Sequence, residues 1–481
     1  LAHYSTPGVI PPSSRLPSDL RELQRQPLRV WQLWKYGLAL TVKATQMTGD
    51  VLAHTIWGPR RKSWGIEMTL ITSFMRGAGH HAALFDLGFV RAIASIGGLM
   101  PLPSDALVTP VTFRVKSRHL RGILSELDMT ETGERLLSGE WIVGKHTWHR
   151  LQSEWKTART ENWSKPAKKE QVVLYVHGGA YYVSSAAAQR LLTIPLAKHS
   201  DARVFALDYR LAPETRFPGP LHDVVSAYFR LVDDLHIPPE NIVVAGDSAG
   251  GGLAVALLMY LRDNKYPLPS GGILMSPWVD LTLSCASWDT NADYDVVPIP
   301  DPNSHMNPIT CYLGGNVDAY IAHPYASPLF GDFTGLPPLL VQCGDAEVLR
   351  DEITLLAHKA RSAGVDVRLE LYQDAVHIFQ MFPFLDASRR AFESIGAFVR
   401  EVLPQNMGAL DLSAERSLER EIENSDTKVV RGDGVETATR VDSISISDSD
   451  RESSRSYASW RVRSSDKHRL PSPPSSEDDD D

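Results

Sequence analysis

The chain has 481 residues with 49 basic and 58 acidic side chains, a formal net charge of −9, and 43% of its residues are hydrophobic. This composition is that of a globular protein with a large core, so a wholly disordered or fibrous protein is excluded. The acidic balance argues against a nucleic-acid-binding protein, and the three cysteines form no CxxC pair, which argues against zinc-ribbon and redox sites.

The first segment in chain order, residues 1–19, is rich in proline and serine and is expected to be unstructured. Beyond it, apolar side chains recur every three or four positions, as in a helix. The residues with this spacing are Leu33, Tyr36, Leu40, Ala44, Met47 and Val51. Further helices are expected at 63–76 and 82–96, so residues 20–164 are interpreted as a helical N-terminal region.

No apolar run approaches the roughly 18 residues that span a bilayer, because Lys35 and Lys43 interrupt the best candidate. The chain also lacks the order of basic, apolar and small residues that marks a secretory signal. Trp31 and Trp34 beside Lys35 are compatible with an interfacial helix lying on a membrane, and the alternative is a helix packed on the protein itself. We therefore expect a cytoplasmic protein or one that is peripheral to an internal membrane.

After a lysine-rich linker at 165–169, short apolar runs alternate with helical stretches. The expected strands are 171–177, 203–208, 241–246, 272–276, 338–343 and 367–372. The expected helices are 186–198, 222–235, 249–262, 351–363 and 387–402. Hydrophobic strands separated by helices predict an α/β fold with a mostly parallel sheet and helices on both faces. Residues 284–335, rich in Pro, Asp and Asn, break the alternation and are interpreted as an insertion over a sheet edge.

The final segment, 404–481, differs in composition from the rest of the chain. Residues 405–481 contain 18 acidic and 11 basic side chains, so they carry −7 of the net charge of −9. Such a segment has too little apolar surface to offset its ordering entropy, and we expect a disordered acidic, serine-rich tail. A phosphorylated regulatory or partner-binding tail and a solvated extension without a specific role both fit this composition.

The clearest chemical motif is Gly-Asp-Ser-Ala-Gly at 246–250, a G-x-S-x-G between an expected strand and an expected helix. In this context the glycines permit a tight turn that exposes the Ser248 hydroxyl above the sheet. A serine hydroxyl is a poor nucleophile near neutral pH and needs a base. Ser248 is therefore the candidate nucleophile, and a structural glycine turn is the alternative.

Four histidines lie between Ser248 and residue 403. His305 and His323 lie in the expected insertion, and His358 lies inside an expected helix. His377 comes a short loop after the last expected strand, from where a base can reach back over the sheet. His377 is therefore the candidate base.

The candidate acid lies in the loop at 344–352, after the strand at 338–343. One carboxylate there should accept the Nδ1 proton of His377 and stabilise the imidazolium. Asp345 and Glu347 both lie in the loop, whereas Asp351 and Glu352 fit the acidic first turn of the next helix. Spacing alone does not decide whether Asp345 or Glu347 is the acid.

A second glycine-containing segment, His-Gly-Gly-Ala-Tyr at 177–181, follows the first strong strand. Adjacent glycines allow the backbone to approach a ligand and to direct amides at it, as an oxyanion hole requires. The amides of Gly178, Gly179 and Ala249 are therefore the candidate oxyanion donors.

Taken together, these motifs resemble the hormone-sensitive lipase family of α/β hydrolases. Further family-like blocks are DYRLAPE at 208–214, SPWVDL at 276–281 and VHIFQ at 376–380. The resemblance covers roughly 165–403 and implies an α/β-hydrolase catalytic domain there, with a cap formed by 20–164 and 284–335. The tryptophan-rich N-terminal half looks like that of fungal members, some of which are similar to steryl acetate hydrolases.

The resemblance also bears on individual residues. In the family motif the catalytic carboxylate stands five residues before the Glu of a closing Asp-Glu pair, which corresponds to Glu347, with Asp345 as the alternative acid. Two positions depart from the family pattern. Ala180 replaces the usual third glycine but keeps its amide, and Gly252 replaces a common asparagine.

The resemblance implies a serine carboxylesterase or lipase-like enzyme that hydrolyses small-molecule esters through an acyl-enzyme on Ser248. Short to medium acyl esters are expected, with steryl or other acetyl esters among the candidates. The chemistry requires no metal or cofactor. The alternative is a catalytically silent protein that only binds its ligand, as plant gibberellin receptors resemble this family, and a third reading is an interaction protein that acts through its tail. The oligomeric state is left open.

Overall fold

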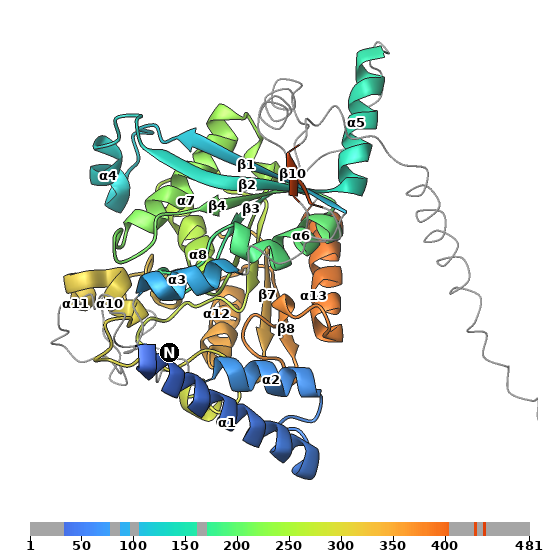
Figure 1. Cartoon of the computed structure of the whole chain (residues 1–481). Coiled ribbons are helices and arrows are strands. Elements are labelled where there is room, and N and C mark those ends of the chain that lie inside the picture. The colour runs from blue at the N-terminus through green and yellow to red at the C-terminus, as the bar shows by residue number, and fades with distance from the viewer. Residues whose placement is uncertain are drawn as a thin grey trace, which may run out of the picture. The chain divides into compact units, whose positions relative to one another are not determined.

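The computed structural model describes residues 33–76, 87–96, 105–160 and 171–403, together with two short strands at 428–430 and 436–438. The expected unstructured segment 1–19 and most of the tail 404–481 lie outside the described residues. The described part is built around one large sheet with helices on its two faces (Figure 1).

The central sheet contains ten described strands in the order β10-β9-β1-β2-β4-β3-β5-β6-β7-β8. Their bounds are β1 Ala106–Arg114, β2 Leu136–Gly144, β3 Val172–Val176, β4 Arg203–Asp208, β5 Ile242–Asp247, β6 Gly271–Met275, β7 Leu339–Gly344, β8 Val367–Tyr372, β9 Lys428–Val430 and β10 Glu436–Ala438. All neighbours from β4 through β8 run parallel. β3, β5, β6 and β7 are buried at every position, which explains their continuous apolar sequences. The expected α/β fold is confirmed.

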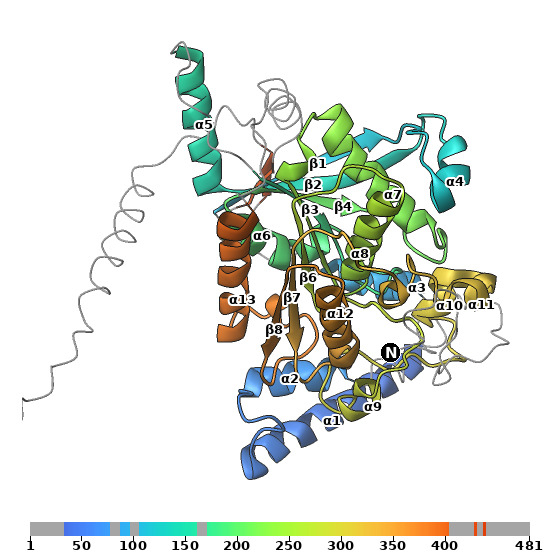
Figure 2. The same ribbon diagram turned by 180° about the vertical axis from the view of Figure 1, so that it is seen from behind.

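Helices cover both faces of this sheet. Their bounds are α6 Arg190–Ser200, α7 Gly219–Phe229, α8 Ser248–Asp263, α12 Arg350–Ser362 and α13 Asp386–Ala397. On one face, α6 and α13 share a core with the strands, in which Leu192, Ile395 and Val243 are fully buried. On the other face lie α7, α8 and α12, which Figure 2 shows from behind.

The N-terminal region corrects one expectation. Residues 20–164 were interpreted as a helical region with no strand expected in it, but β1 and β2 form an antiparallel hairpin that joins the sheet beside β4. The physical reason is the local sequence, because Val, Thr and Phe alternate along β1 and favour a half-buried strand. Trp141 of β2 packs on Phe205 of β4, with ring centroids 5.0 Å apart. The described helices of this region are α1 Leu33–Trp57, α2 Ile66–Met75, α3 Leu87–Ile96, α4 Ser125–Met129 and α5 Lys145–Thr160.

The tail needs a smaller correction. It was expected to be unstructured throughout, but β9 pairs with β1 and β10 pairs with β9, both antiparallel. The edge of β1 that faces away from β2 carries backbone groups able to pair with a further strand, and Val429, Val430 and Thr437 have high strand propensity.

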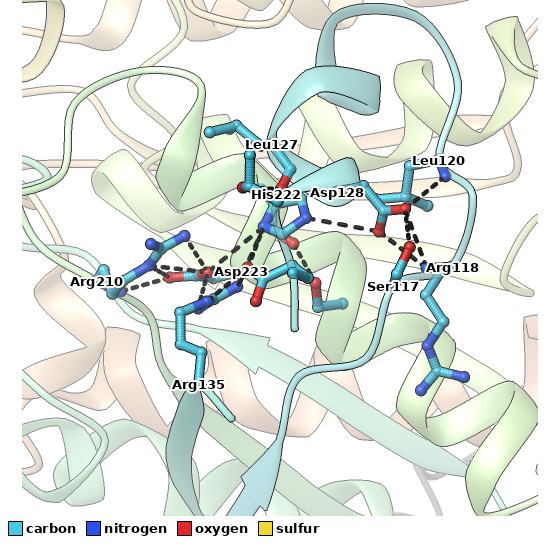
Figure 3. Close-up of polar contacts among 12 residues, drawn as sticks. Ser117, Arg118, Leu120, Leu127, Asp128, Arg135, Arg210, His222 and Asp223 are labelled. Carbon is cyan, nitrogen blue, oxygen red and sulfur yellow. Dashed lines mark hydrogen bonds and ion pairs between the residues drawn. The ribbon is translucent and has the colours of Figure 1, made fainter. Parts of the chain in front are cut away.

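A buried polar cluster connects the β1–β2 hairpin to α7 (Figure 3). The Asp128 carboxylate accepts backbone N–H bonds from Arg118 at 2.9 Å and from Leu120 at 3.1 Å. Nearby, Asp223 of α7 accepts from both Arg135 and Arg210, each at 2.8 Å. Removing one partner of such a buried pair leaves an uncompensated charge, so these contacts hold the hairpin in one position relative to α7.

Between β6 and β7 the chain leaves the sheet and forms only short helices, α9 Ser287–Thr290, α10 Pro308–Leu313 and α11 Val317–Tyr320. This is the region interpreted as an insertion at 284–335. None of the described helices combines the length and the apolar composition needed to cross a membrane.

Candidate active site

Ser248 lies on a tight bend between β5 and α8. Its φ is +49°, a left-handed conformation that is strained for a residue with a side chain. The flanking glycines are required by close backbone approaches: a Cβ on Gly246 would lie 2.4 Å from the Gly250 oxygen, and one on Gly250 would lie 2.1 Å from the Val176 oxygen. The bend therefore exists only because these two positions lack side chains, and it places Ser248 at the N-terminus of α8.

The three side chains predicted as nucleophile, base and acid lie in contact. His377 Nε2 is 2.9 Å from Ser248 Oγ, and His377 Nδ1 is 2.9 Å from Glu347 Oε2. A carboxylate can only accept, so Nδ1–H donates to Glu347 and leaves Nε2 free to accept the serine proton. All three residues are buried. This is the geometry of a nucleophile, a base and an orienting acid.

Glu347 and Asp345, which spacing left open, occupy different places. Glu347 contacts His377 through Oε2, and its Oε1 accepts the Gly344 amide at 2.9 Å. Asp345 instead accepts the backbone amide of Asp374 at 2.6 Å through Oδ1. The structure therefore brings Glu347, and not Asp345, to the histidine.

The surroundings of His377 favour its charged form. Burial alone would lower the pKa of His377, but the hydrogen bond to Glu347 and its charge outweigh burial, so that the pKa is raised. The charges of Asp295 and Asp247 act in the same direction. An imidazolium formed by proton transfer from Ser248 would be stabilised in this site.

The oxyanion prediction needs a correction at Gly178. Its amide donates to Asp247 Oδ1 at 2.9 Å, so it is not free to bind an oxyanion. Spacing could not reveal this, because Asp247 was considered only as part of the serine motif. Among the described residues, the amides of Gly179 and Ala180 have no hydrogen-bond acceptor. The Ala249 amide lies in the first turn of α8, where no carbonyl of the same helix can accept it.

Two residues next to the triad were missed in the sequence. Asn291 Nδ2 donates to the carbonyls of Asp345 at 3.0 Å and of Glu347 at 2.8 Å. The Asp295 carboxylate accepts the amides of His377 at 2.9 Å and of Val348 at 2.8 Å. The only sequence signal was the richness of the insertion in Asp and Asn, which does not say which residue faces the site.

The hairpin of α1 and α2 rests on the loops that carry the triad. Trp64 Nε1 donates to the Asp374 carbonyl at 2.6 Å. The indole of Trp64 also belongs to a buried cluster with Met68, Val296, Ala346 and Val376. Val376 precedes the histidine and Ala346 precedes the glutamate, so this hairpin helps to fix both loops.

No group of three His, Cys, Asp or Glu side chains in the described part of the chain could hold a metal ion. The contacts of Ser248, His377 and Glu347 suit proton transfer and nucleophilic attack.

Residues 173–381 match a family model described as an alpha/beta hydrolase fold. An acetyl-hydrolase of Streptomyces hygroscopicus is 40% identical over 243 residues, which cover 50% of this chain and 79% of that protein. An esterase of Acinetobacter venetianus is 35% identical over 241 residues, covering 50% of this chain and 78% of that protein.

Solved esterase structures are similar as well. The crystal structure of an esterase from the bacterial hormone-sensitive lipase family has a TM-score of 0.55 at 34% identity, covering 72% of this chain and 100% of that chain. EstE5, in a crystal soaked with p-nitrophenyl butyrate, has a TM-score of 0.56 at 30% identity, covering 71% of this chain and 99% of that chain.

Proposed function

The chain belongs to the hormone-sensitive lipase family of α/β hydrolases and is a carboxylic ester hydrolase, and we propose that Ser248 is its nucleophile, His377 its base and Glu347 its acid. The observation that carries this proposal is the continuous line of contacts from Ser248 Oγ through both ring nitrogens of His377 to Glu347 Oε2, each 2.9 Å long.

The proposed reaction has two steps. His377 Nε2 takes the proton of Ser248 as Oγ attacks the ester carbonyl, and the protonated imidazole then gives this proton to the leaving alcohol, forming an acyl-enzyme. Water, deprotonated by His377, next attacks the acyl carbonyl, and the imidazolium returns this proton to Ser248 Oγ as the bond from Oγ to the acyl carbon breaks and the acid is released. The amides of Gly179, Ala180 and Ala249 are the donors that would bind the oxyanion in both steps.

The proposal is tested with Ser248→Ala on p-nitrophenyl butyrate. We expect kcat to fall by roughly three to six orders of magnitude, because the triad acts as a unit. A matched control is Ser226→Ala, which removes a buried serine hydroxyl that donates to the His222 carbonyl of its own helix, at 2.7 Å. Activity of Ser248→Ala equal to that of the control would overturn the proposed nucleophile.

A fluorophosphonate probe separates this enzyme from the alternative, a protein that only binds its ligand. The probe reacts with a serine that has been activated by a base, so we expect one label per chain, on Ser248. Labelling should disappear in His377→Ala. An unlabelled wild-type protein that still binds an ester would favour the ligand-binding alternative.

For the substrate we propose esters of short acyl chains, acetyl to butyryl. This rests on two similar proteins, an acetyl-hydrolase and an esterase whose crystal was soaked with p-nitrophenyl butyrate. A series of p-nitrophenyl esters from acetate to palmitate, together with steryl acetates, tests both the acyl and the alcohol part. The highest kcat/KM on acetate or butyrate is expected, and a maximum at palmitate would contradict the proposal.

We also propose that the α1–α2 hairpin contacts a membrane surface. Ile56 is 65% exposed, Trp57 80% and Phe74 61%, and the turn next to Trp57 carries the exposed basic residues Arg60 and Lys62. Exposed apolar and aromatic side chains beside basic ones are typical of helices that lie in the interface of anionic lipids.

Co-sedimentation with phosphatidylserine-containing vesicles tests this contact. Replacing Ile56, Trp57 and Phe74 by serine should reduce vesicle binding about tenfold or more, since each buried apolar side chain contributes on the order of 1.5–3 kcal/mol. The control is Met129→Ser with Leu136→Ser, two exposed apolar residues outside the hairpin. Equal binding by both variants would contradict the proposed surface.

A further inference from the structure

Asp295 is a buried carboxylate in the insertion between β6 and β7, and it connects the two loops that carry the proposed base and acid. Its Oδ1 accepts the backbone N–H of His377 at 2.9 Å, and its Oδ2 accepts that of Val348, the residue after Glu347, at 2.8 Å. Oδ1 also accepts the Val296 amide at 2.8 Å. One side chain therefore binds the backbones of both loops.

The same segment supports the acid loop a second time. Asn291, one turn before Asp295, donates to the carbonyls of Asp345 and Glu347. The Asp295 amide in turn donates to the Asn291 carbonyl at 3.0 Å, which fixes the two side chains relative to each other. The segment 291–295 thus binds the acid loop through two side chains. The Asn291 amide donates to backbone carbonyls of the loop, and the Asp295 carboxylate accepts a backbone N–H from it.

These bonds matter because the proposed catalytic contact spans two separate loops. Glu347 follows β7 and His377 follows β8, so the distance from Nδ1 to Oε2 depends on how the two loops lie relative to each other. Hydrogen bonds from backbone amides to an ionised carboxylate are shorter and about twice as strong as neutral ones. A displacement of about 1 Å at a catalytic contact can cost on the order of a hundredfold in rate.

We propose that Asp295 is a positioning residue of the triad, which holds the Glu347 and His377 loops in register and supplies a second negative charge to the His377 imidazolium. This inference rests on the proposed function, since it assumes that His377 acts as the base. It assigns to the insertion a part in positioning the residues of the triad.

The electrostatics agree with this geometry. Burial raises the pKa of Asp295 to about 6; the charge on His377 opposes this rise, and that on Glu347 adds to it. The titratable groups whose charges act on Asp295, or on which its charge acts, are His377, Glu347 and the thiol of Cys343. The carboxylates whose charges act on His377 are Glu347, Asp295 and Asp247. The Asp295 charge raises the pKa of His377, so its loss must shift the acid limb of activity to lower pH.

The test is Asp295→Asn in the full-length chain, assayed with p-nitrophenyl butyrate between pH 5 and 9 (about four units around the imidazole range). Asn keeps one acceptor oxygen but turns an N–H₂ group toward one of the two backbone amides. We expect kcat to fall about tenfold to a hundredfold with KM changed less than about threefold. We also expect the acid limb of kcat/KM to move to lower pH.

The matched control is Asp128→Asn. Asp128 is also a buried aspartate whose carboxylate accepts two backbone amides, those of Arg118 and Leu120, but it lies in the polar cluster of the β1–β2 hairpin (Figure 3). This variant should lose stability without any shift of the acid limb. Counting active sites with a fluorophosphonate corrects both rates for unfolded protein.

Asp295→Glu and Asp295→Ser cover the case in which Asp295→Asn does not fold. The glutamate variant retains the charge and should keep the acid limb near that of the wild type, whereas the serine variant should show the downward shift. An unmoved acid limb with kcat within about twofold of the wild type in the neutral variants would overturn the proposal, as would an equal shift in Asp128→Asn. Both outcomes are measured against a wild-type enzyme that is active through Ser248. Failure of this inference is therefore distinguishable from failure of the proposed function, which Ser248→Ala tests.

Discussion

At the residue scale, the contacts of Glu347 and Asp345 predict different consequences of removing each charge. Glu347→Gln removes the negative charge beside His377 and, if its oxygen keeps the Gly344 amide, turns an N–H₂ group toward Nδ1, so kcat should fall about a hundredfold to ten-thousandfold. Asp345→Asn weakens only a bond to the Asp374 amide and should lower kcat less than about tenfold. Steady-state kinetics on p-nitrophenyl butyrate compare the two variants, which differ in their distance from the imidazole. A larger loss in Asp345→Asn would assign the acid to Asp345.

The raised pKa of His377 predicts the pH dependence of the reaction. The imidazole accepts a proton only when it is neutral, so kcat/KM should fall as the pH drops through a pKa above the ordinary value for histidine. Burial lowers this pKa and Glu347 raises it, so the residual activity of Glu347→Gln should persist to lower pH than that of the wild type. The pH profiles of kcat/KM for the wild type and for Glu347→Gln measure the two acid limbs. An acid limb at higher pH in Glu347→Gln would contradict the assignment.

The three triad residues could be predicted from the sequence because their chemistry is tied to chain position. Ser248 follows a strand in a motif of fixed spacing, and His377 follows the last long strand. Gly178 could not be judged in this way, because whether its amide is free depends on the side chain of Asp247, 69 positions later. The role of Asp295 could not be predicted either, because an irregular insertion has no periodicity that indicates which side chain points inward.

At the element scale, Gly252 shows how closely α8 approaches the segment after β6. A Cβ at this position would lie 2.3 Å from the Trp278 carbonyl oxygen and 3.0 Å from the Tyr181 hydroxyl. In this chain the position therefore requires a glycine, where the family commonly has an asparagine. Gly252→Ala should lower the free energy of unfolding by about 1–3 kcal/mol or more, as overpacking does.

Urea denaturation measures this change, and Gly88→Ala is its control. Gly88 also lies in a helix, α3, but an added Cβ there meets no atom within 4 Å. That variant should gain up to about 1 kcal/mol, because alanine favours a helix over glycine. A gain in stability for Gly252→Ala would show that α8 has more room than the contacts allow.

The attachment of the α1–α2 hairpin predicts that its two tryptophans near the turn are not equivalent. Trp64→Ala removes a buried indole and its bond to the Asp374 carbonyl, and should cost about 3–5 kcal/mol. Because the indole packs in one buried cluster with Val376 and Ala346, kcat should fall as well. Trp57→Ala removes an indole that is largely exposed, so kcat and stability in solution should be nearly unchanged.

Hydrogen exchange of the hairpin together with kcat on p-nitrophenyl butyrate measures both effects. Faster exchange and slower turnover in Trp64→Ala alone would support the anchoring role. Equal kinetics in the two variants would mean that the hairpin does not influence the triad loops.

The elements of the parallel sheet were predictable because strands buried on both faces have continuous apolar sequences. The bounds of β3, β4, β5, β6, β7 and β8 all lie within one residue of their expected positions. β1 and β2 were missed because their hairpin is exposed in part and its alternating pattern is interrupted by Pro110. A proline within a run weakens its reading as a strand.

At the scale of the whole molecule, the site follows from the order of the strands. β5, β6, β7 and β8 are neighbours and run parallel, so their carboxyl ends lie along one edge, and Ser248, Glu347 and His377 each follow one of these ends. β6 contributes too, since the Ser276 hydroxyl accepts the Ile378 amide at 3.2 Å. Ligand sites of open parallel sheets are found at this edge.

This arrangement also predicts what the end of the chain contributes to hydrolysis. All described side-chain bonds to the three triad residues come from positions 248 to 377. A chain truncated after Ala438 keeps β9 and β10 on the edge of β1, so its kcat/KM on p-nitrophenyl butyrate should stay within about twofold of the full-length value. Truncation after Leu403 additionally frees the β1 edge and should lower the urea midpoint while leaving the triad chemistry in place. A tenfold or greater loss of kcat/KM (about 1.4 kcal/mol) in the first truncation would mean that the acidic tail takes part in catalysis, and the interaction-protein reading would then have to include the active site.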